Sequence, residues 1–385
     1  MDARDAWIAL ASVPGVGEET FGLLLADFGS AKSVFAAVGD GRLDSWLANK
    51  RAESGRPAMP SPTLGELRAV AADPTDKLGQ IAALGLWTIT ALDADYPSRL
   101  RDLPSPPVVI HGLGDPATLG AERTVGVVGT RRPTPAGRAL TARICARLVE
   151  CSATVVSGLA VGIDGAAHAA TLERGGITVG VIGAGHRSPG PRAHARLRDE
   201  VAANGGAVIS EHHPATKATR GTYPRRNRII AALADAVIVV EAPRTSGALI
   251  TARHALELGR QVLVAPGRVG DWSTAGSLAL LRDTPARPLV GLDEMVADLG
   301  YFNAPRGSSG GGPATASREA ALAMLGEAER AVARRLSDGP AGLDLLVAQT
   351  GLGPAVVSSA ITFLLMRGWV HAVGPAFVAA GPLSK

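Results

Sequence analysis

TYPRRNRIIAALADAVIVVEAPRTSGALITA (residues 222–252) joins a block of positive charge to an apolar run and a polar turn. Within it, Ala236–Val240 (AVIVV) is β-branched, which is typical of a strand covered on both faces. The letters RTSGALITARHALELG come next, and there Thr245 or Ser246 can cap a helix that Gly259 ends. A buried strand, a polar turn and a helix in this order predict one repeat of a parallel α/β sheet.

Positive charge gathers just ahead of this strand. Arg225, Arg226 and Arg228 precede the apolar letters IIAALA, and Lys217 and Arg220 lie upstream of them. These five cations fall within twelve residues that contain no acid. Such a run attracts polyanions, although a run of charge is more often a solvated loop. We favour binding because the run adjoins a buried strand.

The turn after the strand is suited to an anion. The first turn of a helix leaves backbone N–H groups without partners inside the helix, and such groups attract negative charge. Here they would lie beside Ser246, Gly247 and Thr251.

Two further strand-to-helix turns carry unusual residues. In VGVVGTRRPTPAGR (125–138) a strand ends at Gly129, and Thr130, Arg131 and Arg132 precede a helix. In VVSGLAVGIDGAAHAA (155–170) the residues of interest are Ser157, Gly158, Leu159, Gly162, Asp164 and His168. Glycine could simply permit a tight turn, Asp164 could cap the helix, and for His168 we favour packing over catalysis. Because parallel strands end at one edge of a sheet, all three turns should meet in one crevice.

The middle of the chain alternates regularly between strand and helix patterns. After residues 84–112, which predict a strand, a proline-rich loop and a second strand, helical stretches separate six candidate strands. These strands are Val125–Gly129, Thr154–Ser157, Thr178–Gly183, Ala207–Ser210, Ala236–Glu241 and Gln261–Ala265. The alternation predicts a doubly wound, Rossmann-like α/β domain with a parallel sheet.

Several cofactor sites are excluded. The sequence has no phosphate-binding G-x-x-x-x-G-K-[ST], and in a dinucleotide fingerprint that starts at Gly183 the third glycine would be Ser188. The histidines His186, His194, His212 and His213 have no spacing with cysteines or carboxylates that suits a metal. Cys145 and Cys151 are the only cysteines, and we expect buried free thiols. We therefore expect neither a cofactor nor a metal.

Length and charge suggest several domains. The 385 residues carry a net charge of +4, but residues 122–300 hold 22 Lys/Arg against 15 Asp/Glu, whereas residues 1–121 hold 10 against 15. A nucleic acid or nucleotide would therefore be sought in the middle of the chain. No apolar run is long enough to span a bilayer and the N-terminus lacks a signal pattern, so we expect a cytoplasmic protein.

The two ends read as helical modules. Residues 5–37 place apolar residues at helical spacing on both sides of PGVGEET and resemble a helix-hairpin-helix, but this acidic region favours a plain helical hairpin over contact with DNA. Residues 50–66 read as a connector, and the Ser/Gly-rich residues 303–317 as a flexible linker. The last segment predicts three helices and a β-hairpin, the order of a winged helix, although the would-be recognition helix Pro354–Met366 has no charge. We favour packing or protein contact for that helix.

Four segments in order resemble the DNA-processing protein A family, DprA or Smf. They are VGVVGTRRPTPAGR, VVSGLAVGIDGAAH, TYPRRNRIIAALADAVIVVEA and SGALITARHALELGRQVLVAPG. The resemblance is strong over residues 90–300 and implies an extended Rossmann-like domain. With it we divide the chain into a helical (helix-hairpin-helix or SAM-like) domain at 1–75, the Rossmann-like domain at 76–300, a linker at 301–317 and a winged helix at 318–385.

The resemblance also implies a function. Members of the family bind single-stranded DNA without hydrolysing it, dimerise, and load the recombinase RecA onto strands coated by single-strand-binding protein during natural transformation and recombination. Carried over by position, strand phosphates would lie at the turns Gly129–Arg131, Ser157–Leu159 and Ser246–Gly247. A cation and an aromatic ring, here Arg220 and Tyr223, would lie beside the PRRNR run, which includes Asn227. Single-strand binders combine a basic track with rings on which bases stack.

This chain departs from the family pattern at some positions. Val161, Gly190, His194 and Leu278 replace residues usual in the family and put finer contacts in doubt. The alternative function is that of a phosphoribohydrolase acting on nucleoside monophosphates, because such enzymes share the fold. They resemble PGGxGTxxE at the turn where this chain has RTSGALITARH, with no acid before Glu257. We therefore expect a binding protein and not an enzyme.

Overall fold

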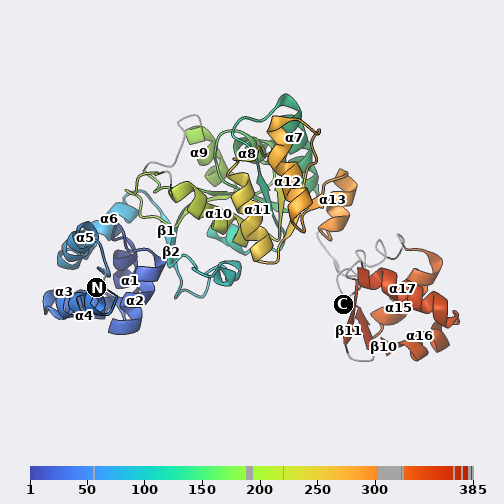
Figure 1. Cartoon of the computed structure of the whole chain (residues 1–385), viewed down its shortest axis with the longest axis horizontal. Coiled ribbons are helices and arrows are strands. Elements are labelled where there is room, and N and C mark those ends of the chain that lie inside the picture. The colour runs from blue at the N-terminus through green and yellow to red at the C-terminus, as the bar shows by residue number, and fades with distance from the viewer. Residues whose placement is uncertain are drawn as a thin grey trace. The chain divides into compact units, whose positions relative to one another are not determined.

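The computed structural model describes residues 1–54, 57–187, 194–219, 221–301, 322, 325–366, 369–373, 376–379 and 383. Two compact units make up the chain, Met1–Leu292 and Asp293–Lys385. Figure 1 labels the helices and strands of both units.

A nine-stranded sheet forms the centre of the first unit, with strand order β1-β2-β6-β5-β4-β3-β7-β8-β9. The strands are β1 (Trp87–Thr90), β2 (Val109–Gly114), β3 (Thr124–Val128), β4 (Thr154–Ser157), β5 (Thr178–Val181), β6 (Ala207–Ser210), β7 (Ala236–Val239), β8 (Gln261–Val264) and β9 (Arg287–Pro288). Neighbouring strands from β6 to β9 are parallel, whereas β1 and β2 pair antiparallel at one edge. The predicted doubly wound α/β fold with a parallel sheet is confirmed.

Strand β3 is the point at which the chain changes direction across the sheet. From β3 the chain builds β4, β5 and β6 outward on one side, then returns to add β7, β8 and β9 on the other. The carboxyl ends of β3 and β7 therefore lie side by side, with Val128 aligned with Val239. In open α/β sheets ligands bind in the crevice at such a switch point.

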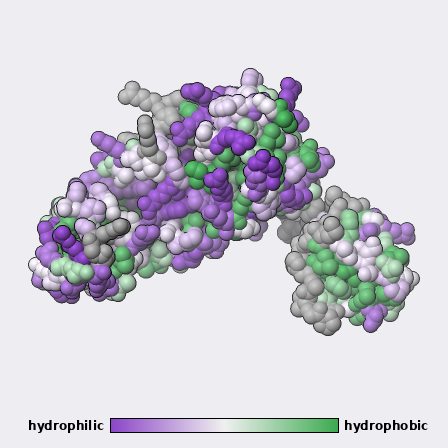
Figure 2. Space-filling model, viewed as in Figure 1, coloured by the Kyte–Doolittle hydropathy of each residue, from purple (hydrophilic) through white to green (hydrophobic). Residues whose placement is uncertain are grey.

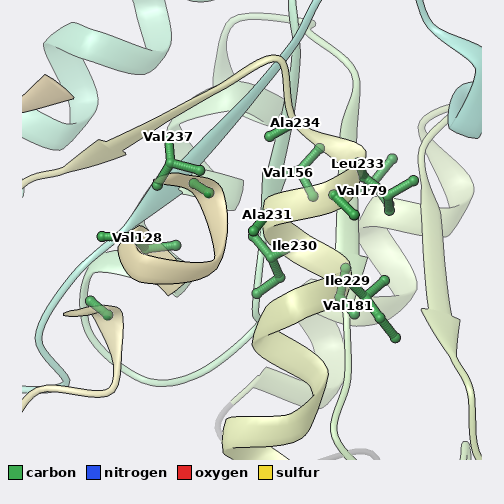
Figure 3. Close-up of a cluster of buried hydrophobic side chains, with 14 of the residues drawn as sticks. Val128, Val156, Val179, Val181, Ile229, Ile230, Ala231, Leu233, Ala234 and Val237 are labelled. Carbon is green, nitrogen blue, oxygen red and sulfur yellow. The ribbon is translucent and has the colours of Figure 1, made fainter. Parts of the chain in front are cut away.

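Helices cover the sheet, and every residue of β3 to β7 is buried, as expected for strands with both faces covered. These helices are α7 (Pro135–Glu150), α8 (Ile163–Glu173), α9 (Ala195–Ala203), α10 (Thr222–Leu233), α11 (Ala248–Glu257) and α12 (Ala275–Asp283). Figure 3 shows apolar side chains of α10 against the strands, with Ile229 near Val181 and Leu233 near Val179. Helix α10 thus begins with the arginine run and ends as part of the core.

Six helices precede the sheet. They are α1 (Ala3–Ala11), α2 (Glu18–Phe28), α3 (Ala31–Gly39), α4 (Arg42–Ser54), α5 (Ser61–Ala72) and α6 (Pro74–Ala82). Residues 50–66, expected to form a connector, are largely helical, because α4 ends only at Ser54 and α5 begins at Ser61. Leu67 and Val70 of α5 bury their side chains in the same core as Phe21. Apolar spacing therefore prevails over the Pro and Gly content of this stretch.

The second unit has the element order of a winged helix. It contains α15 (Glu327–Ser337), β10 (Ala341–Gly342), α16 (Leu343–Thr350), α17 (Pro354–Met366), β11 (Val370–Val373) and β12 (Ala376–Ala379), and α13 (Leu292–Asp298) spans the division between the units. The three strands form a sheet in the order β10-β12-β11, and Figure 2 shows hydrophobic residues on this unit's visible surface. The predicted linker 303–317 lies outside the described residues.

Two other expectations concern the cysteines and possible membrane-spanning helices. Cys145 and Cys151 are both buried, as predicted. No single helix in the described ranges is long and apolar enough to cross a membrane, although two bent helix pairs pass a test of length and composition.

Candidate functional site

A cleft of about 790 Å³ lies at the switch point of the sheet, and we call it the strand-end cleft. Its walls are the turn after β3, the turn after β7, the start of α8, and α10 with the residues just before it. Eleven of the nineteen predicted binding residues line it: Gly129, Thr130, Arg131, Arg132, Asp164, Tyr223, Arg226, Asn227, Ser246, Gly247 and Thr251. Residues of all three strand-to-helix turns are thus brought to one place.

The other predicted residues lie elsewhere. Ser157, Gly158, Leu159 and Gly162 are buried beneath the cleft wall, and Lys217, Arg225 and Arg228 line separate hollows beside the N-terminal helices. Arg220 lies outside the described residues.

Arg226 is a buried tie and not an exposed cation. Its side chain is only 4% exposed, and Nη1 donates to the backbone oxygens of Gly158, at 2.5 Å, and of Val181. Nη2 lies 3.8 Å from Oδ2 of Asp164, and Nε donates to Oδ1 of Asn227 at 3.0 Å. The guanidinium therefore joins α10 to the ends of β4 and β5.

Asp164 is the counter-charge of this tie. Burial raises the pKa of the Asp164 carboxyl, while the Arg226 charge and backbone hydrogen bonds from Gly129 and Gly158 oppose that rise. Paired buried charges of this kind are costly to separate, because either partner alone is left uncompensated. Asp164 thus holds the turn after β4 in place.

The turn after β4 has no room for side chains at its glycines. A Cβ on Gly158 would collide with the Arg226 guanidinium and with Asp164, and a Cβ on Gly162 would collide with the backbone of Thr130. Gly162 also has a φ of +96°, and Leu159 a φ of +52°. Ser157 donates through Oγ to the Val127 oxygen at 2.6 Å. These residues shape the cleft from behind rather than from its surface.

The accessible charge in the cleft is carried by Arg131 and Arg132. Both are exposed, and within the described part of the chain neither forms an ion pair. Arg131 Cζ lies 5.3 Å from the ring centroid of Tyr223, close enough for a cation–π contact. The Thr130 N–H is not available to an outside ligand, because it donates to the backbone oxygen of Glu241 at 2.7 Å.

The start of α11 forms the opposite wall. Gly247 is the N-cap, with no side-chain cap of its own, and Ser246 Oγ accepts from the Ala248 N–H at 3.3 Å. Asn227 Nδ2 donates to the Gly247 oxygen at 3.1 Å and so ties α10 to this turn. The positive end of the α11 dipole therefore faces the cleft.

Arg225 and Arg228 are paired with acids from other parts of the chain. Both form ion pairs with Glu18, the first residue of α2, and Arg228 also pairs with Glu211 at 2.6 Å. A Cβ on Gly17 would lie 3.2 Å from Arg225 Nη2, so the glycine turn of the helical hairpin faces this arginine. The hairpin thus contacts the chain's own arginines.

Five histidines of the first unit are shielded from solvent enough for burial to lower the pKa of each. Burial lowers the pKa of His111 and His168 to about 3, and that of His186 and His212 to about 4. His168 is fully buried against Thr178, with Nδ1 2.7 Å from Oγ1. Among the described residues no group of three or more His, Cys, Asp or Glu could hold a metal ion.

The departures from the family pattern have different settings. His194 Nδ1 lies 3.0 Å from the Leu159 oxygen, and the ring fills the space beside Gly165. Val161 is exposed and Leu278 half-buried, while Gly190 lies outside the described residues. Among the lining residues that were not predicted is Trp272, an exposed aromatic residue that follows the loop after β8.

Comparisons with known proteins match most of the chain to one family. The family model for DNA recombination-mediator protein A matches residues 87–300, and the model for the DprA winged helix domain matches residues 316–374. DNA processing protein DprA of Bacillus subtilis is 39% identical over 198 residues, which cover 51% of this chain and 66% of that protein. A Mycobacterium tuberculosis relative is 39% identical over 287 residues, covering 73% of this chain and 72% of that protein.

Two solved structures share the fold. The X-ray structure of DprA from Streptococcus pneumoniae matches with a TM-score of 0.55 and 33% identity, over 62% of this chain and 81% of that one. DprA from Helicobacter pylori, whose structure is described for its single-stranded DNA binding mode, matches with a TM-score of 0.51 and 27% identity, over 56% and 95%. The match to the B. subtilis protein and a similar one to protein Smf of Synechocystis leave a third or more of each relative unmatched.

Proposed function

This chain belongs to the DNA recombination-mediator protein A (DprA/Smf) family, and from that premise we propose that it binds single-stranded DNA in the strand-end cleft and loads a RecA recombinase onto it. A role in DNA processing follows from the family; the ligand, the site and the partner are the proposal.

One observation carries the site. Arg131 and Arg132 are exposed at the sheet's switch point, no acid pairs with them among the described residues, and Arg131 lies over the Tyr223 ring. Proteins that bind single strands combine such a basic track for phosphates with aromatic side chains for bases. The start of α11 adds the positive end of its helix dipole on the opposite wall, although the Ala248 and Leu249 N–H groups donate within the turn itself.

The buried residues of the cleft have a supporting role in this proposal. Arg226 and Asp164 fix the turn after β4, and Asn227 fixes the turn before α11. Arg225 and Arg228 are held by Glu18, so we assign the primary phosphate contacts to Arg131 and Arg132. Lys217, which is exposed, extends the positive track beyond the cleft.

We propose no catalytic step. The two candidates for acid–base chemistry are Asp164, which is buried and paired with Arg226, and His168, which is fully buried. The Asp164 carboxylate is paired with Arg226, and the His168 imidazole does not line the cleft, so we assign neither as a general base for a ligand. Release of base or phosphate from AMP, CMP or ATP, lost in Asp164→Ala, would instead support a phosphoribohydrolase.

RecA loading, assembly on strands coated by single-strand-binding protein, and dimerisation are proposed on family membership alone. The test is RecA-driven strand exchange on DNA coated with single-strand-binding protein, with and without this protein. Stimulation at substoichiometric amounts is expected. Unchanged exchange at every stoichiometry would remove the mediator role while leaving DNA binding to be judged by its own assay.

A further inference from the structure

An exposed tryptophan stands at the rim of the strand-end cleft. Trp272 begins the short 3-10 helix η4 (Trp272–Thr274), which follows the loop after β8. Its side chain lines the cleft and is 67% exposed. No hydrogen bond or ring contact of the indole occurs in the part of the chain that the structure describes. A single exposed apolar residue is common on protein surfaces and needs no functional explanation. A role for Trp272 must therefore be argued from the residues around it.

The backbone that presents Trp272 is firmly attached to the cleft wall. The N–H groups of Gly276 and Ser277 donate to the Ala242 oxygen at 2.8 and 3.0 Å, and Ser277 Oγ accepts from the Ala242 N–H at 3.1 Å. A Cβ on Gly276 would lie only 2.6 Å from the Pro243 oxygen, so the two segments are in close contact. Ala242 and Pro243 belong to the turn after β7. The indole is therefore held on a fixed support beside the anion-type turn.

The N-terminal side of η4 is fixed as well. Asp271 accepts from the Ser273 N–H at 2.9 Å and from Ser273 Oγ at 2.8 Å, which caps the short helix. Thr274 is buried and fills the space beside Gly267, where a Cβ would collide with it. An exposed ring on a segment anchored at both ends is preorganised for contact, because little conformational entropy is lost on binding.

Tyr223 and Trp272 differ in what covers them. The Arg131 guanidinium lies over the Tyr223 ring, whereas the Trp272 ring has no such partner within the described ranges. We propose that Trp272 is a base-stacking residue of the strand-end cleft, so that a single strand whose phosphates meet Arg131 and Arg132 lays a base on the indole. This inference rests on the proposed function and adds a residue that the family resemblance did not supply.

The chemistry of stacking restricts the ligand. A ring can stack on a base only where the base is unpaired and has left its own stack, so Trp272 favours single strands over duplex. Because every base has a π-face, the contact is tolerant of sequence. Trp272 therefore contributes to recognition of strandedness and not of sequence.

A two-by-two comparison tests the contact. Wild type and Trp272→Ala are each titrated with a dT oligomer and with an abasic oligomer of equal length and charge, by fluorescence anisotropy. Stacking on one base is worth roughly 1–3 kcal/mol, so Trp272→Ala should bind dT about 5- to 150-fold more weakly. On the abasic strand the two proteins should bind alike, and Trp272→Phe should stay close to wild type on dT.

Intrinsic fluorescence gives a second readout. Of the five tryptophans only Trp272 is strongly exposed, since Trp7, Trp46 and Trp87 are half-buried and Trp369 is buried. Binding of dT should quench wild-type emission, and Trp272→Phe should lose most of that quenching while still binding.

The two failures are distinguishable. If wild type binds dT but Trp272→Ala binds dT equally well, or is weakened as much on the abasic strand, base stacking on Trp272 is refuted and the proposed function stands. If wild type binds no strand, the proposed function itself falls, and this inference with it. An unchanged urea midpoint for Trp272→Ala is expected because the side chain is exposed, and it shows that any loss of binding is not a loss of folding.

Discussion

Replacing Arg226 with methionine should destabilise the first unit by about 3–5 kcal/mol, the usual cost of removing one partner of a buried ion pair. The structure explains the size of the effect. The guanidinium is 4% exposed, and methionine would leave the buried Asp164 carboxylate without its cation. It would also leave the Gly158 and Val181 oxygens without the donor that Arg226 supplies.

The assay is urea unfolding at neutral pH followed by tryptophan fluorescence, because four of the five tryptophans lie in Met1–Leu292. Arg196→Ala is the matched control. It removes an arginine that is 91% exposed and paired with Glu200, and a surface pair of this kind contributes little to stability. Adding Asp164→Asn to Arg226→Met should restore part of the stability, because the uncompensated charge is then gone.

A free energy of unfolding for Arg226→Met within about 1 kcal/mol of the wild-type value would refute this role for Arg226. The guanidinium would then not be a structural tie. It would have to be counted with Arg131 among the cations available to a ligand.

Three further predictions concern the rest of the chain. Glu18→Gln releases Arg225, whose side chain is 49% exposed. If Arg225 then neutralises one more phosphate, a dT oligomer should bind about fivefold more tightly at 0.1 M salt, as measured by fluorescence anisotropy. Equal affinity would mean that Arg225 does not reach the strand. Burial lowers the pKa of His168 to about 3 in the folded protein, whereas the ordinary histidine pKa of 6.5 applies to the unfolded chain. Between these two values only the unfolded chain takes up the proton. The stability that the neutral imidazole contributes is therefore fully present above pH 6.5 and is lost as the pH falls toward 3. His168→Gln should therefore reduce the slope of unfolding free energy against pH by up to about 1.4 kcal/mol per pH unit between pH 6 and 4, and an unchanged slope in urea titrations would contradict the burial argument. Deleting residues 318–385 should weaken binding of a single strand by less than tenfold, about 1.4 kcal/mol; a larger loss in the same anisotropy assay would assign the winged helix to the DNA site.

The strands were predictable because their β-branched runs are local and are bounded by turn residues. Thr154–Ser157 and Ala207–Ser210 were predicted with the bounds that the structure gives them. Strand β9 was missed because Arg287–Pro288 is two residues long and has no pattern to detect. The order of helices and a hairpin also predicted the winged helix, whereas single-stranded DNA as the ligand came from the family resemblance.

The burial and the ion-pair partners of the arginine run were predictable only in part. Arg226 shares a helix face with Ile230 and Leu233, four and seven residues later, so helical spacing would have placed it on the buried side of α10. The partner of Arg225 and Arg228 was not predictable, because Glu18 lies 207 residues before Arg225 and no local pattern joins them. Trp272 was overlooked because a lone tryptophan in a loop becomes informative only when the fold brings it to the cleft.

The most direct test of the strand-end cleft is binding of a dT oligomer across a salt series, comparing wild type with Arg131→Ala, Tyr223→Ala and the control Arg196→Ala. Each phosphate neutralised on a single strand contributes about −0.7 to the slope of log affinity against log salt, so Arg131→Ala should flatten the slope by about that amount. Tyr223→Ala should instead cost roughly 1–3 kcal/mol of affinity with little change in slope. Arg196→Ala, on the exposed surface of α9, should match wild type. Four superimposed curves, or duplex DNA bound as tightly as the single strand, would contradict the assignment of this cleft to single-stranded DNA.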